Sequence, residues 1–163
     1  MLGKPRVHEE AAVKTADVID RLREGLASLR AQRPRVEASA PFPISGNILH
    51  NAPEAVWYPP EVLAHLTEML PFWFGECERI LAGDGSEPVP FGRVADNELR
   101  IGVIARDRTL PLRELYARVD SLVERAIARL GELSDADRVV ARSRAVFIAI
   151  DPSVFGVGAV PTS

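Results

Sequence analysis

The sequence V-L-A-H-L-T-E-M-L-P-F-W, from Val62 to Trp73, predicts an apolar helix with a histidine at its margin. Proline suits the first turn of a helix, so we expect this helix to begin at Pro59 or Pro60. The glycines of G-D-G directly after Ala82 are a stop signal, and the predicted end is near Leu81.

Most apolar residues of this helix share one face. At about 100° per residue they fall in a single broad arc. Its members are Val62, Leu63, Leu66, Met69, Leu70, Trp73, Phe74, Cys77, Ile80 and Leu81. His65 lies at the edge of the arc, while Glu61 and Glu68 fall on the polar side, close enough to contact the imidazole.

Other segments on both sides have the same helical period. The first runs from about Val13 to Arg33 and should end before Pro34. A short helix is predicted from Asn97 to about Asp107. The most regular amphipathic pattern runs from Leu110 to Gly131.

These patterns predict an all-α protein with a core between facing stripes. We expect Trp73 and Tyr116 to be buried on facing stripes, Trp57 to lie at a junction between loop and helix, and Leu122 to lie in the apolar stripe of its helix.

Turn-forming residues fill the intervals between the predicted helices. Prolines make 34–58 an extended connection, and 83–96 reads as a loop. Residues 145–150 have the composition of a strand, but a strand at the end of a helical domain has no sheet to join. We therefore predict an N-terminal tail at 1–12, a helical domain at 13–144 and an irregular tail at 145–163.

The composition of the chain limits the classes of protein and partner to which it can belong. The chain has 163 residues, 47% of them hydrophobic, which suits one domain with one core. Its net charge of -3 comes from interspersed charges of both signs, which argues against nucleic acid as a partner. No apolar run is long enough to span a bilayer and no signal peptide is visible, so we expect a cytoplasmic protein without a membrane partner. Cys77 is the single cysteine and should pack as a small hydrophobic residue.

Several motifs together resemble the DinB-like superfamily. They are E-V-L-A-H-L-T-E-M-L-P-F-W at 61–73, P-F-G-R at 90–93, E-L-R-I at 98–101 and R-D-R-T-L-P-L-R-E-L at 106–115. The resemblance covers about 13–144. It implies an up-down-down-up four-helix bundle, often dimeric, in a superfamily that includes metal-dependent thiol transferases using mycothiol or bacillithiol.

The resemblance also implies a metal site that this chain does not complete. Active members bind a divalent metal through one histidine early in the second helix and an H-x-x-x-H pair in the fourth. His65 matches the first of these positions, and nothing matches the pair. The fourth helix is therefore expected to be absent or replaced by the non-helical tail.

His65 has three interpretations. It can be a histidine at the edge of the core bonded to Glu61 or Glu68, a metal ligand that is vestigial or completed by another subunit, or a general base acting without metal. Catalytic zinc sites usually have three protein ligands, so zinc or nickel would bind here only with help from a second subunit.

Two functional hypotheses follow. The chain is a non-catalytic bundle that binds a small molecule or another protein, or it is a metal- and thiol-dependent transferase or isomerase. Loss of the fourth helix should leave a hydrophobic groove. We expect a second subunit to cover that groove in a homodimer, the alternative being the tail residues Val146, Phe147, Ile148, Ile150 and Phe155.

Overall fold

The computed structural model of this chain is predominantly helical. It describes residues 14–43, 57–84, 86–93, 97–134, 136–137 and 145–147. Its elements are α1 (Thr15–Ala38), α2 (Pro59–Ala82), β1 (Val89–Phe91), α3 (Glu98–Asp107), α4 (Leu112–Glu132) and β2 (Ala145–Phe147). None of the helices in this described part is long and apolar enough to cross a membrane.

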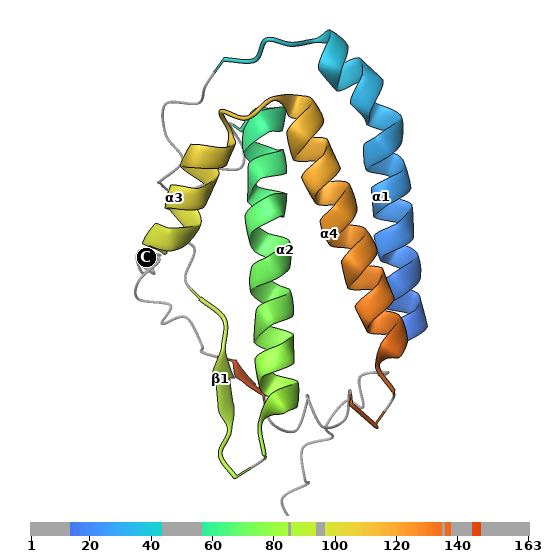
Figure 1. Cartoon of the computed structure of the whole chain (residues 1–163), viewed down its shortest axis with the longest axis vertical. Coiled ribbons are helices and arrows are strands. Elements are labelled where there is room, and N and C mark those ends of the chain that lie inside the picture. The colour runs from blue at the N-terminus through green and yellow to red at the C-terminus, as the bar shows by residue number, and fades with distance from the viewer. Residues whose placement is uncertain are drawn as a thin grey trace, which may run out of the picture.

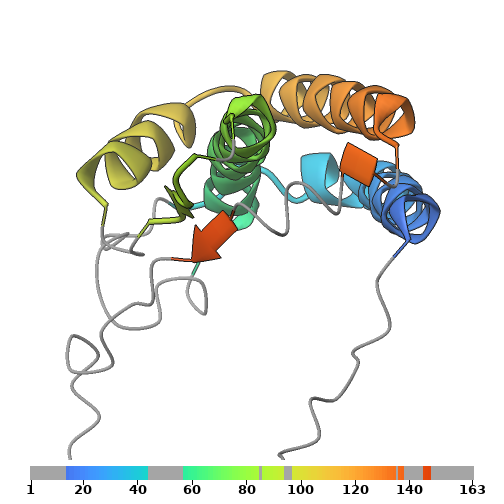
Figure 2. The ribbon, with the colours of Figure 1, turned by 90° about the horizontal axis from the view of Figure 1, so that it is seen from below.

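The helices form a curved row rather than a closed ring. Helix α2 contacts both α3 and α4, and α1 packs against α4. Figure 1 shows α2 and α4 running in the same direction and α1 running in the opposite one. Seen from below, α3, α2 and α4 lie side by side, with α1 and β2 on the same side of the row (Figure 2). Helix α2 is therefore the central element of the row.

The core lies between α1, α2, α3 and α4 and is made mainly of aliphatic side chains. Its buried members are Leu26, Leu63, Ala64, Ile104, Leu115, Tyr116, Val119 and Val123. Trp57, at the junction between loop and α2, packs against this cluster, as its predicted position requires. Tyr116 is buried as predicted, at 2% exposure.

The predicted bounds of the last three helices are confirmed to within two residues, and local chemistry explains them. The side chain of Asn97 accepts a hydrogen bond from Arg100 N at the start of α3. At the start of α2, the carboxylate of Glu61 accepts a 3.0 Å hydrogen bond from Tyr58 N. These are interactions between near neighbours in the sequence.

The predicted end of α1 is wrong, because the helix continues through Pro34 to Ala38. A proline removes one hydrogen bond from a helix, and other contacts hold the turn that follows it. Arg33 pairs with Glu37 across that turn at 2.9 Å, and Val36 packs against the core. Stabilisation from these contacts outweighs the local preference of proline.

The expectation that a C-terminal strand has no sheet to join is also wrong. Strand β2 pairs in parallel with β1, which lies inside the predicted loop 83–96, and Val146 is opposite Pro90. Of the tail residues named as a possible cover, Val146 and Phe147 belong to β2, and the others lie outside the described residues. We predicted that no fourth helix follows α4. Most of the chain after α4 lies outside the described residues, so this prediction is not tested.

Glu76 connects the β1 segment to α2. Its Oε2 accepts a 3.0 Å hydrogen bond from Gly92 N, and Arg79 donates both to Glu76 and to the carbonyl oxygen of Pro90. Gly92 has a φ of 103°, which a residue with a side chain rarely adopts. One carboxylate thus orients the turn that ends β1.

Several residues of the predicted apolar stripes are less buried than expected, and Val62, in the predicted arc of α2, is 42% exposed. Trp73 is half-buried, since its ring lies 6.4 Å from that of Phe91 in β1 rather than between helices. Cys77 is exposed, and partial desolvation of its sulfur together with Glu78 and Glu76 raises the pKa of the thiol. Leu122 is half-buried, because Val123 points into the core in its place.

Substitutions in α4 should distinguish these depths of burial. Leu115→Ala should lower the free energy of unfolding by about 2–5 kcal/mol, because Leu115 is fully buried and its truncation leaves a cavity. Leu122→Ala should cost only about 1–2 kcal/mol, since its side chain is already partly in water. Urea unfolding measures both losses of free energy. Equal losses would contradict the difference in burial between Leu115 and Leu122.

Acidification should weaken the link made by Glu76. Its hydrogen bond with Arg79, and then that with Gly92 N, lowers the pKa of the carboxyl below 4.5. The stabilisation is therefore present above pH 4.5 and is lost as the pH falls through the lowered pKa. The difference in unfolding free energy between wild type and Glu76→Gln should shrink from pH 6 to about pH 3. Glu24→Gln, on the exposed face of α1, is the control, and a constant difference for Glu76 would refute the link.

Candidate functional site

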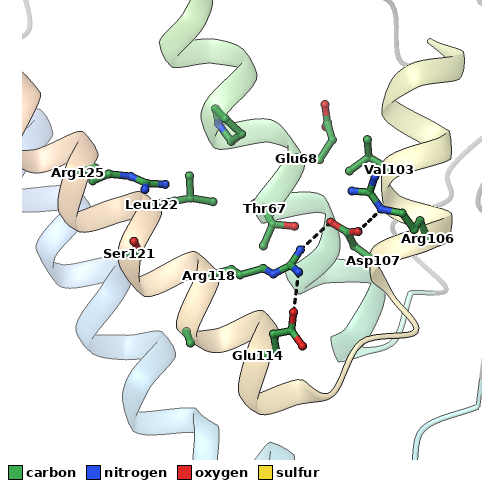
Figure 3. Close-up of a pocket in the computed structure, with 12 residues that line it drawn as sticks. Thr67, Glu68, Val103, Arg106, Asp107, Glu114, Arg118, Ser121, Leu122 and Arg125 are labelled. Carbon is green, nitrogen blue, oxygen red and sulfur yellow. Dashed lines mark hydrogen bonds and ion pairs between the residues drawn. The ribbon is translucent and has the colours of Figure 1, made fainter.

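A groove lies between α2, α3 and α4. Its upper section, named in the orientation of Figure 1, is the pocket shown in Figure 3. This pocket has a volume of about 640 Å³, a size within the usual range for small-molecule sites. The lining residues are Thr67, Glu68, Pro71, Val103, Arg106, Asp107, Glu114, Ala117, Arg118, Ser121, Leu122 and Arg125. We call this pocket and its continuation below the α2–α4 groove.

Ion pairs occupy the end of the upper section where α3 meets α4. Asp107 is 4% exposed and accepts a 2.6 Å hydrogen bond from Arg106 and a 3.4 Å hydrogen bond from Arg118. Arg118 also donates to Glu114 at 2.6 Å (Figure 3). The charges at this end of the groove are thus largely neutralised by one another.

Arg125 differs from these arginines. Its side chain extends from α4 toward α2 beside Leu122 (Figure 3), and it lines both sections of the groove. Among the described residues it has no carboxylate within ion-pair distance, whereas Arg106, Arg118 and Arg129 each have one. A guanidinium can bind a carboxylate through two parallel hydrogen bonds. Arg125 is therefore available to an anionic group.

The lower section continues the groove toward the C-terminal ends of α2 and α4. It has a volume of about 280 Å³. Its lining residues are Leu70, Pro71, Phe74, Glu78, Leu122, Arg125, Ala126 and Arg129. Arg129 donates to both oxygens of Glu78, at 2.5 and 2.9 Å, which joins α4 to α2 at the far end. An apolar channel between Arg125 and this ion pair results.

The groove lies on the face of α4 turned away from α1. Arg30 of α1 pairs with Asp120, and Arg33 lies 5.3 Å from the ring of Tyr116. At 3.6 residues per turn, Arg118 and Arg125 are about half a turn away from those positions. The packing of α1 therefore leaves the groove open.

Glu61 and Glu68 are buried, which contradicts their predicted place on the polar side of α2. Their side chains are 1% and 6% exposed. Arg93 forms an ion pair with both oxygens of Glu68, and Arg108 lies 3.4 Å from Glu61. Buried carboxylates are tolerated when they are paired and hydrogen-bonded. The arginines come from segments distant in the sequence, so helical spacing alone gave the wrong result.

His65 lies beside Glu68 at the rim of the core. Its Nδ1 is 3.9 Å from Oε2 of Glu68, and its ring packs edge-on against Trp57 at 5.4 Å. The side chain is 22% exposed. The position is at the edge of the core, but 3.9 Å exceeds hydrogen-bond distance, so the expected bond to Glu68 is not formed at this atom.

The structure does not assemble further metal ligands near His65 from the residues it describes. No group of three or more histidine, cysteine, aspartate or glutamate side chains suitable for a metal ion occurs among them. His65 and Glu68 together supply fewer than the three protein ligands usual for a catalytic zinc. These two residues do not by themselves fit the metal site that the resemblance implies.

Sequence reasoning did not identify the α2–α4 groove. Arg118, Leu122, Arg125 and Arg129 follow one another at steps of four, three and four residues, which places them in one stripe beside the buried stripe of α4. That spacing was the available signal. The spacing does not show which of these arginines has a carboxylate partner, because the partners include residues of α2 and α3.

Metal binding to His65 can be tested by calorimetry with zinc and with nickel. We expect the isolated chain to form no tight one-to-one complex, because the described residues bring too few further metal ligands to His65. A submicromolar complex lost in His65→Ala and kept in the control His50→Ala would overturn this prediction. It would then direct the search for ligands to Glu68, to Glu61 or to a neighbouring subunit.

Comparison with known proteins returned no relatives: no family model, no curated protein and no solved structure matches this chain. The resemblance to the DinB-like superfamily thus stays a prediction from motifs.

Proposed function

We propose that this protein is a helical bundle that holds a small organic molecule in the α2–α4 groove. The observation that carries the proposal is the combination, in one concave site, of an apolar surface with a cation that has no carboxylate partner among the described residues. Leu122 and Pro71 line both sections, and Arg125 lies at the point where the sections meet. Ligand sites typically combine mostly apolar walls with a few well-placed polar groups.

Binding without catalysis agrees best with the chemistry of the groove. It contains Thr67 and Ser121 as hydroxyl groups, and the described residues that line its two sections include no histidine or cysteine. An activated hydroxyl nucleophile needs a base within hydrogen-bond reach. The hydroxyl of Thr67 instead donates to the carbonyl oxygen of Ala64 at 2.8 Å, so it is engaged in the helix.

A metal- and thiol-dependent transferase is the second candidate. The proximity of His65 to Glu68 supports it, because imidazole and carboxylate are both metal ligands. Glu68 also lines the groove, so a ligand bound there would lie near this pair. The zinc and nickel titration described above separates this candidate from simple binding.

The proposal includes a DinB-like bundle for the fold and a homodimer for the assembly. The opposite direction of α1 and the shared direction of α2 and α4 agree with the order up, down, down that the resemblance implies for three helices (Figure 1). The half-buried Trp73 on the lower part of α2, which lines neither section of the groove, is consistent with cover from a second subunit. Light scattering gives the mass of the protein in solution.

Filling the groove should abolish ligand binding. Ala117 is exposed and lines the upper section, so Ala117→Trp places an indole in the groove without altering the core. The neutral apolar probe N-phenyl-1-naphthylamine should bind wild type in equilibrium dialysis and bind this variant at least about tenfold more weakly.

The matched control is Ala128→Trp, because Ala128 is an exposed alanine of α4 that lines neither section. It should retain the affinity of wild type. If wild type does not take up the probe, or if both tryptophan variants bind it equally, the groove is not the binding site.

A further inference from the structure

We infer that the ligand of the α2–α4 groove is a singly charged amphiphile with one anionic headgroup and one unbranched apolar chain of medium length. The inference rests on the proposed function and adds the chemical class of the ligand. Three features support it: the charge balance of the groove, the composition of its lower section, and the ion pair at the far end of that section.

The charge balance favours a headgroup with one negative charge. Arg106 and Arg118 share Asp107, and Arg129 is held by Glu78, which leaves Arg125 as the cation without a carboxylate among the described lining residues. Glu114 and Glu78 are already paired with Arg118 and Arg129, so a second negative charge on the ligand would find no free guanidinium among the described lining residues. The guanidinium of Arg125 is therefore expected to bind a ligand headgroup with a single negative charge, such as a carboxylate.

The lower section suits an alkyl chain. Between Arg125 and the Glu78–Arg129 pair, its walls are Leu70, Pro71, Phe74, Leu122 and Ala126, with no hydroxyl or amide side chain among them. A polar ligand placed there would lose hydrogen bonds to water without replacement. An alkyl chain loses none, and each buried methylene contributes about 0.8 kcal/mol, or roughly fourfold in affinity.

The Glu78–Arg129 pair limits the length of the chain. The guanidinium of Arg125 lies beside Leu122 (Figure 3), and on α4 Leu122 and Arg129 are seven residues apart, which corresponds to about 10 Å along the helix axis. An extended alkyl chain advances about 1.25 Å per carbon at ordinary bond lengths, so a chain of roughly eight to ten carbons fills this length. Longer chains would meet the charged pair or leave the groove.

A homologous series of straight-chain carboxylates tests the inference, measured by displacement of N-phenyl-1-naphthylamine from the wild-type protein. From butanoate to octanoate, affinity should rise about fourfold per methylene and level off near ten carbons. Octanoate should bind about tenfold more tightly than 1-octanol of equal chain length, because only the carboxylate pairs with Arg125.

Matched variants assign these two effects to residues. Arg125→Gln should reduce the preference for octanoate over 1-octanol to about twofold or less, whereas Arg113→Gln, an exposed arginine of α4 outside the groove, should leave it unchanged. Phe74→Ala should flatten the dependence on chain length, and Phe42→Ala, outside the groove, should not. Urea unfolding of each variant excludes loss of folding as the cause.

The outcomes separate the inference from the proposed function. If the probe binds in a manner sensitive to Ala117→Trp but carboxylates show neither a chain-length trend nor an advantage over alcohols, the ligand class is wrong and the groove remains a binding site. The same holds if Arg125→Gln and Arg113→Gln behave alike. If the probe itself does not bind wild type, both proposals fail.

Discussion

The arrangement of the bundle depends on the burial of two carboxylates on α2, Glu61 and Glu68. A carboxylate removed from water is stable only when a cation and hydrogen bonds replace the lost solvation. Arg93, which follows β1, and Arg108, which follows α3, supply those cations. Both partner segments are therefore held against α2 by electrostatic interaction as well as by apolar packing. The position of α3 beside α2, and with it one wall of the groove, follows from this constraint.

The same physical chemistry produces the groove and gives it its polarity. Ion pairs between helices hold α3, α2 and α4 at the edges of the groove, through Asp107 with Arg118 at one end and Glu78 with Arg129 at the other. Between them, the half-buried Leu122 and Phe74 form an apolar floor. Charges that are already paired stabilise the structure, and among the described residues Arg125 has no carboxylate within ion-pair distance, which is why the proposed ligand is placed beside it.

His65 illustrates the difference between a motif and a site. Its position in the helix led to the prediction, from a motif alone, that it corresponds to a metal-binding histidine. Its surroundings contain Glu68 at 3.9 Å and the ring of Trp57, a setting that equally suits a structural histidine at the rim of a core. A motif is fixed by neighbours in the sequence, whereas a metal site requires ligands brought together from several segments.

The amino-acid sequence by itself determined the helices α2, α3 and α4, because apolar periodicity, proline in the first turn and the Asn97 cap are interactions between neighbours. It did not determine that α1 continues through Pro34, that Glu61 and Glu68 are buried, or that β1 pairs with β2. Each depends on partners far along the chain: core packing by Val36, guanidinium groups from other segments, and hydrogen bonds between strands. The α2–α4 groove belongs with these, because an arginine is unpaired only relative to carboxylates that other helices place out of its reach. Tertiary structure alone decides that distance.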